Sequence, residues 1–292
     1  MKRRTYSLVG MIALFIAGLA ILLYPSFSDW WNTRRANSLI VEYEQVVTEM
    51  ETDDTENLRK TAAAYNETLL GKRLPDAFAE LQLPPDATYE SMLNPAGNGF
   101  MGTVDVPAIK QNLPIFHYTT PEILEKGAGH LAGSSLPVGG DSTHCVVTAH
   151  RGLPSAKLFT DLDRIKEGDV FYLHTLGETL AYEVDQIKTV EPSQTEDLSI
   201  VRGKDYCTLV TCTPYAVNTH RLLVRGHRIP YEEEEYQKQL KQSAAPSATS
   251  VAIRILCVII GIVLALLIIL ISSRRGKKKR KHSTHNKGET SE

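Results

Sequence analysis

The chain has few cysteines and no excess of positive charge, and each of these shortages argues against one class of protein. Its 292 residues include four cysteines, whereas secreted domains held together by disulfides are short and rich in cysteine. Its formal net charge is −2, and nucleic-acid binding needs a basic surface. It also lacks a cluster with the spacing of metal ligands. A disulfide scaffold and a nucleic-acid-binding protein are therefore disfavoured, and no metal or cofactor is expected.

Two long apolar runs lie near the ends of the chain, each beside a cluster of positive charge. Residues 7–24 carry no charged side chain and follow a Lys-Arg-Arg sequence. Residues 251–272 are apolar except for one arginine near their start, and a lysine-rich tail follows them. Each run is close to the ~20 residues that cross a bilayer, and basic clusters stay on the cytoplasmic side. The sequence predicts a two-pass cell-membrane protein with both termini in the cytoplasm and the intervening region outside the cell.

Each apolar run has an alternative interpretation. The first resembles a cleavable signal peptide, but no small-x-small cleavage site follows it, so an uncleaved anchor is favoured. The second resembles a buried core helix, which the basic tail behind it disfavours. The predicted terminal segments are cytoplasmic tails at 1–6 and 273–292 and transmembrane helices at 7–24 and 251–272.

Between the predicted spans the sequence changes character three times. Residues 25–70 have no glycine, and their apolar positions fall at helical spacing, which predicts helices. Residues 71–99 are rich in proline and glycine and predict a long loop or lid. Residues 100–231 contain short β-branched runs separated by turn residues, which is typical of a β-sandwich or barrel. Residues 232–250 read as a solvated acidic helix and a Ser/Ala/Pro linker.

Three polar residues stand at the ends of predicted strands in the β region. Cys212 and His150 each end a β-branched run, and Arg221 opens another. A nucleophilic cysteine needs a group that exchanges protons and a donor that stabilises the oxyanion. An imidazole supplies the first, and the forked donors of a guanidinium supply the second. The pattern predicts cysteine-based catalysis at one edge of the barrel.

Each of these residues also has a purely structural interpretation. Cysteine is among the most buried residue types, a lone histidine is more often structural, and an arginine at a strand start is usually a solvated edge charge. Cys212 departs from the buried class because polar Thr211 and Thr213 flank it and a Pro-Tyr turn follows. Cys145 and Cys207 stay in that class. Spacing alone makes a catalytic trio plausible without requiring it.

Five segments of the β region resemble the sortase family of cysteine transpeptidases. The resemblance covers residues 92–230 and is nearest to the class C, pilin-polymerising sortases, because of the TCTPY form, the NTHRLLVRG form and the second apolar span. The segments are T-L-V-T-C-T-P-Y at 208–215, N-T-H-R-L-L-V-R-G at 218–226, T-A-H-R-G-L-P-S-A-K-L-F at 148–159, L-P-I-F-H-Y at 113–118 and G-H-L-A-G-S-S-L-P-V-G-G at 129–140.

The resemblance implies a mainly β fold, a closed and roughly eight-stranded sortase-type barrel preceded by helices. It maps the nucleophile onto Cys212, the general acid/base onto His150 and the oxyanion or substrate arginine onto Arg221. Thr211, directly before the nucleophile, is a further candidate for holding substrate. The trio chosen from the residues and the trio implied by the family coincide.

Class C sortases usually carry a lid with an Asp-Pro-aromatic motif, and the matching place here is L-P-D-A-F at 74–78. Asp76 and Phe78 fit the motif, and Ala77 replaces its proline. The expectation is that Asp76 pairs with Arg221 while Phe78 covers the Cys212 thiol. The alternative is an ordinary surface loop. Losing the proline is expected to loosen the lid, because proline lowers the entropy cost of ordering.

Cys145 and Cys207 each lie five residues before a candidate catalytic residue, His150 and Cys212 respectively. If their strands run parallel and adjacent, as the resemblance implies, the two thiols lie at matching heights. A disulfide and a pair of reduced core thiols both remain open. The reduced pair is favoured, since disulfide geometry between neighbouring strands is demanding.

The expected function is a two-step transpeptidation outside the cell. The cysteine cleaves an LPxTG-like sorting signal after its threonine, and a pilin lysine amine then attacks the thioacyl-enzyme. The expected partners are pilins or surface proteins with a C-terminal sorting signal, the membrane and a peptidoglycan precursor. Two alternatives stay open: a sortase that anchors proteins to cell-wall precursor, and a non-catalytic scaffold that binds sorting signals.

Overall fold

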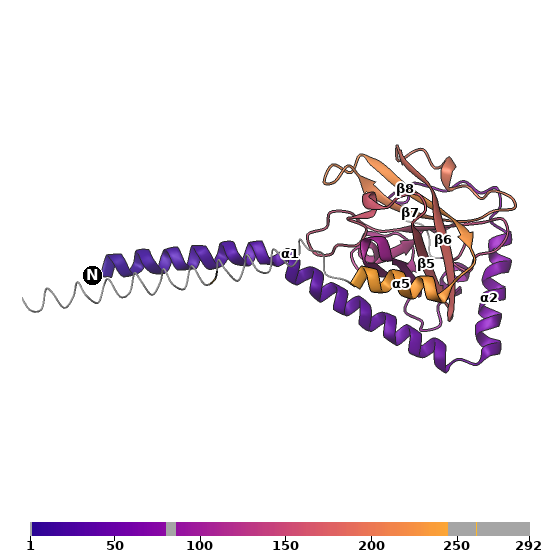
Figure 1. Ribbon diagram of the computed structural model, residues 1–292, viewed down its shortest axis with the longest axis horizontal. Helices are drawn as coiled ribbons and strands as arrows, with labels where there is room; N and C mark the ends of the chain where they lie inside the picture. The colour runs from indigo at the N-terminus through magenta and orange to yellow at the C-terminus, as the bar shows by residue number, and fades with distance from the viewer. Residues whose placement is uncertain (1, 80–85, 245–260, 262–292) are drawn as a thin grey trace, which may run out of the picture. The chain divides into compact units, whose positions relative to one another are not determined.

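The eight strands in the described part of the chain close into a barrel, and Figure 1 labels four of them, β5 to β8. The computed structural model describes residues 2–79, 86–244 and 261. Around the barrel the strands follow the order β1-β2-β3-β4-β7-β8-β6-β5, which confirms the predicted closed, mainly β barrel. The strands are β1 Phe100–Val106, β2 Gln111–His117, β3 Ala128–His130, β4 Thr143–Thr148, β5 Val170–Thr175, β6 Glu178–Val190, β7 Asp205–Thr213 and β8 His220–Ile229.

Helices precede, interrupt and follow the strands. α2 and the second half of α1 lie in the region predicted to be helical, 25–70, and α1 extends back to Lys2. Within the described residues, five short helical segments and α5 accompany them. The helices are α1 Lys2–Glu49, α2 Thr52–Glu67, α3 Ala87–Ser91, α4 Pro121–Leu124 and α5 Glu233–Ala244, with 3-10 turns η1 Pro107–Ile109, η2 Leu162–Arg164 and η3 Glu196–Leu198.

Two strand pairs in the barrel are parallel, and the others are antiparallel. β2 pairs in parallel with β3, and β4 pairs in parallel with β7. The second pair brings together segments about sixty residues apart along the chain. Because parallel strands point the same way, the residues at the ends of β4 and β7 emerge at the same edge of the barrel.

Large side chains pack so closely in the barrel interior that position 226 on β8 has room only for glycine. Phe171 and Tyr182 are fully buried there and stack with ring centroids 5.7 Å apart. A Cβ at Gly226 would lie 2.7 Å from Phe171 Cε1 and 2.9 Å from Tyr182 Cβ. Interiors packed to this density leave no room for such an atom, so a residue with a side chain at position 226 would force Phe171 or Tyr182 to move.

Buried hydrogen bonds attach α1 and α2 to the barrel. The Tyr43 hydroxyl donates to the carbonyl oxygen of Met101 at 3.0 Å and accepts from the backbone N–H of Leu176 at 3.0 Å. From α2, the Asn66 amide donates to the carbonyl of Leu136 at 3.2 Å and accepts from its N–H at 2.7 Å. Each helix thereby satisfies backbone groups that would otherwise be buried without partners.

The predicted membrane spans are not confirmed. The first, at residues 7–24, falls within α1, and the second, at 251–272, lies outside the described residues except for position 261. No helix in the described part of the chain has both the length and the apolar character needed to cross a membrane.

The region predicted as an irregular loop, 71–99, contains the short helix α3. Asp86 caps it, because its carboxylate accepts hydrogen bonds from the backbone N–H groups of Thr88 and Tyr89. The prolines and glycines spread along this region predict turns, so they do not indicate a helix of about one turn and a half between them. In contrast, α5 at Glu233–Ala244 lies where the sequence predicts a solvated acidic helix before the Ser/Ala/Pro linker.

We expect Tyr43→Phe to lower the free energy of unfolding by about 1–3 kcal/mol, because it leaves a buried carbonyl and a buried N–H without partners. Urea denaturation followed by circular dichroism measures the change. Val41→Ala is the control on the same helix, since Val41 is 62% exposed, and it should change stability by less than about 0.5 kcal/mol. Equal effects of the two substitutions would contradict this account.

Candidate active site

Strand register brings the three predicted catalytic residues together. Cys212 lies directly opposite Arg221 in the antiparallel ladder between β7 and β8. In the parallel ladder between β4 and β7, Thr148 lies opposite Val210. The same offset places His150, two residues beyond Thr148, level with Cys212. The predicted trio therefore occupies three neighbouring strand ends at one edge of the barrel.

Arg221 is held in a forked ion pair beside the thiol. Its Nε donates to Asp76 Oδ1 at 2.8 Å and its Nη2 donates to Asp76 Oδ2 at 2.7 Å. Its remaining nitrogen, Nη1, donates to Cys212 Sγ at 3.6 Å. The Arg221 and Asp76 side chains are only 12% and 17% exposed, so water screens the pair weakly, and two-pronged charged hydrogen bonds are among the stronger ones.

Phe78 lies between the histidine and the arginine. Its ring centroid is 5.6 Å from that of His150, and Arg221 Cζ lies 5.0 Å from the Phe78 ring centroid. Cys212 itself is only 8% exposed. Asp76 and Phe78 therefore contact the predicted catalytic residues. The segment that carries them, residues 74–78, packs over the site and is called the cover from here on.

Apolar packing anchors the same segment to the outer face of the sheet. Ala77 is 1% exposed, and Leu74 and Phe78 pack beside it. Val210 of this cluster is two residues before Cys212 on β7, so both side chains point to the same face. The cluster is formed by Ala77, Leu131, Val146, Leu198, Val210 and Leu223, with Leu74, Phe78 and Val190 partly buried against it.

The cover leaves both the thiol and the imidazole in their neutral forms near pH 7. Burial raises the pKa of Cys212, and the nearby Asp76 carboxylate raises it further, while the Arg221 guanidinium lowers it. Burial lowers the pKa of His150, which the negative charge of Glu125 partly offsets. With the cysteine pKa above its usual value and the histidine pKa below its own, the closed site does not favour a thiolate–imidazolium pair.

Thr211, predicted to hold substrate, is turned into the interior instead. It is fully buried, and its hydroxyl donates to the carbonyl oxygen of Ala149 at 2.8 Å. Neighbouring residues on a strand point to opposite faces, so Thr211 cannot share the face of Cys212. Its hydrogen bond joins the strand of the nucleophile to the residue before His150, which is a positioning role.

Arg151 makes a second connection between the same two strand ends, and the sequence interpretation missed it. Its Nη1 donates to Thr213 Oγ1 at 3.2 Å, and its guanidinium pairs with Asp163. The residues next to the histidine and next to the cysteine are thereby linked. The signal was present in the sequence, since an arginine directly follows His150 in the motif that resembles the family.

Helix α1 holds the loop that follows the histidine. Asp29 accepts a hydrogen bond from the backbone N–H of Lys157 at 2.7 Å, and the Asn32 amide donates to the carbonyl of Ser155 at 2.8 Å. The loop closes on His150, whose carbonyl accepts from the N–H of Phe159 at 3.1 Å. Sequence could not reveal this contact, because it joins positions more than a hundred residues apart.

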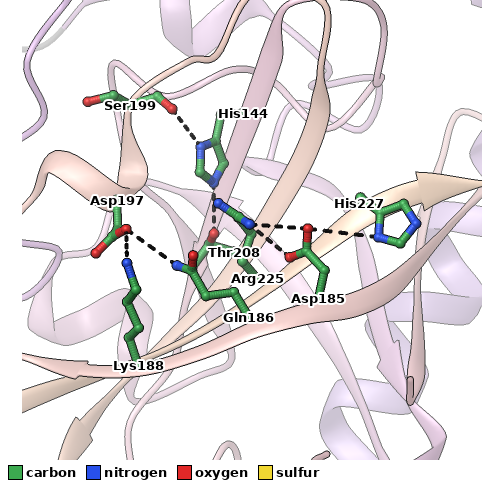
Figure 2. A network of polar contacts seen from close by, with 9 residues as sticks. All are labelled: His144, Asp185, Gln186, Lys188, Asp197, Ser199, Thr208, Arg225 and His227. Atoms are coloured by element: carbon green, nitrogen blue, oxygen red, sulfur yellow. Dashed lines mark hydrogen bonds and ion pairs between the residues drawn. The ribbon is translucent and has the colours of Figure 1, made fainter. Parts of the chain in front are cut away.

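Figure 2 shows a polar network that includes Asp197 and Ser199 of the connection between β6 and β7. The buried His144 lies between the Thr208 hydroxyl, 2.7 Å away, and the Ser199 carbonyl, 2.9 Å away. Burial lowers the pKa of His144 to about 4, so one ring nitrogen donates to the carbonyl and the other accepts from the hydroxyl. The same connection reaches the cover, since Thr195 Oγ1 donates to the carbonyl of Leu74 at 2.9 Å.

Charged pairs on β6 and β8 complete the network. Arg225 binds the Asp185 carboxylate through two nitrogens, and Lys188 binds Asp197 at 2.6 Å. Arg225 lies within β8 with its side chain only 19% exposed, so it is a partly buried structural charge rather than a solvated one. Within the part of the chain that the structure describes, no group of three His, Cys, Asp or Glu side chains is arranged to hold a metal ion.

We expect Asp76→Ala to speed the alkylation of Cys212 by iodoacetamide by about 10- to 100-fold at pH 7. The substitution removes a charged hydrogen-bonded pair worth about 1.5–3 kcal/mol and so favours the open cover. Glu178→Gln removes the partner of an ion pair with Arg59 at another place and serves as the control. Unchanged alkylation in Asp76→Ala would show that the ion pair does not hold the cover closed.

The pH profile of alkylation gives an independent check. In the unsubstituted chain the rate should keep rising above pH 9, the ordinary thiol value, because burial and Asp76 raise the pKa of Cys212. In Asp76→Ala the midpoint should move to lower pH, since a negative charge and part of the burial are lost. A midpoint below pH 7 in the unsubstituted chain would contradict the neutral closed site.

Comparison with known proteins agrees with this geometry. The family model described as "Sortase domain" matches residues 104–229. The crystal structure of Streptococcus pneumoniae Sortase C is 47% identical, with a TM-score of 0.62, and the match covers 66% of this chain and 97% of that chain. Streptococcus agalactiae Sortase C1 is 47% identical, with a TM-score of 0.61, over 67% of this chain and 96% of that chain.

A more distant relative extends the similarity beyond the Sortase C structures. Sortase A of Bacillus anthracis is 24% identical over 225 residues, which are 77% of this chain and 95% of that protein. The barrel, the cysteine, histidine and arginine at its edge, and these similarities lead to one conclusion. The chain belongs to the sortase family of cysteine transpeptidases, and its similarity to solved Sortase C structures places it in class C.

Proposed function

We propose that this sortase cleaves an LPxTG-like sorting signal and joins the threonine carboxyl to a lysine amine of a pilin, so that pilins become covalently linked. The observation that carries the proposal is the placement of Cys212, His150 and Arg221 on three adjacent strand ends under a closed cover. The cover occupies the donors and the apolar surface that a peptide substrate would need, which fits an enzyme whose site opens for a protein partner.

In the first half-reaction, Cys212 transfers its proton to His150 once the cover is displaced. Opening reduces the burial of both groups and removes Asp76, so the thiolate and the imidazolium become more favourable. The sulfur then bonds to the threonine carbonyl carbon, while Arg221 donates to the oxyanion with the nitrogens that Asp76 had occupied. When the threonine–glycine C–N bond breaks, His150 gives its proton to the leaving glycine amine.

In the second half-reaction, an acceptor amine completes the transfer. His150, now neutral, takes a proton from the lysine ammonium or from the attacking amine. The amine nitrogen bonds to the thioacyl carbon, the carbon–sulfur bond breaks, and Cys212 leaves as a thiolate. The protein contributes a positioned nucleophile, one proton carrier and one cationic donor. The isopeptide bond receives the acyl group that the first half-reaction transferred to the Cys212 sulfur.

The surface beneath the cover suits an apolar residue of the sorting signal. Leu74, Ala77 and Phe78 pack there on Val210 and Leu223, and their departure would expose apolar area whose reburial by substrate is favourable. A leucine of the sorting signal has the right chemistry to replace them. We therefore propose that substrate and cover compete for this surface.

The choice of pilins as substrates is supported by the relatives. The Streptococcus pneumoniae Sortase C structure is described together with pilin substrate specificity. A further solved structure, 44% identical, is Sortase C1 of GBS Pilus Island 1 and covers 68% of this chain. We propose the same substrate class here.

We also propose membrane anchoring through the apolar runs at 7–24 and 251–272, on the sequence evidence of their length and basic flanks. The catalytic barrel would then lie outside the cell with both termini in the cytoplasm. Fractionation of cells producing the full chain tests this, and recovery in the soluble fraction would contradict it.

Reconstituted transfer tests the proposal. Full-length enzyme is mixed with a pilin that carries a C-terminal sorting signal, and covalent ladders are followed on denaturing gels. Cys212→Ala should form none, and Arg221→Lys, which keeps the charge but loses the fork, should be slower by about 10²–10³-fold. Arg164→Lys, an exposed arginine elsewhere, is the matched control.

The acceptor decides between the alternatives. Transfer to a pilin lysine supports pilus assembly, whereas transfer only to a peptidoglycan-stem amine would indicate anchoring to cell-wall precursor instead. Ladders formed by Cys212→Ala would contradict the mechanism. Binding of the sorting signal without any cleavage by the unsubstituted enzyme would favour a non-catalytic scaffold.

A further inference from the structure

Two cysteines that the mechanism does not use face each other inside the barrel. Cys145 on β4 and Cys207 on β7 are register partners in the parallel ladder. Both are free thiols in this structure, and they are 3% and 0% exposed. Both belong to the main apolar core, so the two side chains point to the same side of the sheet.

The placement satisfies the main geometric requirement for a disulfide. Neighbouring strands lie about 4.7–4.9 Å apart, and the Cα atoms of disulfide-bonded cysteines lie about 4.4–6.8 Å apart. No strand shift is needed to bring the sulfurs together, since the residues already face each other in register.

We propose that Cys145 and Cys207 are a site of disulfide formation that covalently joins the strand carrying His150 to the strand carrying Cys212. Two S–H bonds are broken and one S–S bond forms. The two electrons and two protons pass to an organic disulfide, such as that of a thiol–disulfide oxidoreductase, which becomes two thiols. The proposal rests on the barrel alone and does not depend on the sorting signal or the acceptor.

Burial determines when the bond can form. Both sulfurs are buried, with Cys145 3% and Cys207 0% exposed, and thiol–disulfide exchange needs a thiolate that can reach the disulfide it attacks. A closed barrel also excludes the oxidant from both sulfurs. The bond is therefore expected to form while the chain folds, before β4 and β7 are covered, and to resist reductants afterwards.

The catalytic thiol would stay free. Cys212 lies five residues after Cys207 on β7, so the two side chains point to opposite faces. The bond would close a loop of 63 residues, from 145 to 207 with both cysteines counted, around the parallel pair that places His150 beside Cys212. It would stabilise that pairing without touching the face where substrate binds.

Thiol counting on the full chain tests the proposal. The chain is refolded with oxidised glutathione, denatured without reductant and treated with N-ethylmaleimide, and its intact mass is measured. Of the four cysteines, we expect two to be labelled, and peptide mapping should show Cys145 joined to Cys207. Labelling of all four, or a bond that includes Cys212, would overturn the proposal.

Variants and thermal unfolding provide the controls. Cys207→Ala should label at all three remaining cysteines, and Cys212→Ala should keep the internal bond. The oxidised chain should melt about 10 °C above the chain refolded with reductant, as expected for closing a loop of this length, and Cys207→Ala should show no such difference. An equal shift in Cys207→Ala would contradict the assignment to this pair.

Discussion

The parallel pairing of β4 with β7 is the constraint on which the rest of the structure depends. It joins distant parts of the chain and sets the height of His150 relative to Cys212. The antiparallel ladder with β8 then fixes Arg221 opposite the thiol. Thr211 and Arg151 add hydrogen bonds across the same seam. Because register determines which residues meet, a shift of one residue would turn the nucleophile into the core.

The cover, residues 74–78, supplies the charged and aromatic partners of the catalytic side chains in this structure. A guanidinium without a partner at a partly buried position would be costly, because it carries a charge. Asp76 pairs with the guanidinium, and Phe78 lies against both the guanidinium and the imidazole. The same contacts keep the cysteine and the histidine neutral, so the closed state is chemically quiet. In the proposed mechanism, a change in packing at the cover is what allows the thiol to become a thiolate.

Sequence predicted the parts of this account that depend on local chemistry and on motif. The closed barrel, the helices before it and the residues gathered at its edge follow from β-branched runs, strand-end polar residues and the resemblance to sortases. Contacts between distant segments could not be predicted, such as Asp29 with Lys157 or His144 with Ser199. Thr211 was chosen for its place directly before the nucleophile, whereas strand alternation points its side chain inward, where it bonds to the carbonyl of Ala149. Helix α3 was missed because its single capping residue, Asp86, stands among prolines.

The most direct measurement is the site of acylation. The enzyme is incubated with a peptide carrying an LPxTG-like signal, quenched in acid, digested and mapped by mass spectrometry. The account predicts that the acyl group, ending in threonine, is attached to the sulfur of Cys212, and that Asp76→Ala accumulates it faster. An acyl group on Cys145, on Cys207 or on a side chain other than cysteine would contradict the assignment of the nucleophile and of the site built around it.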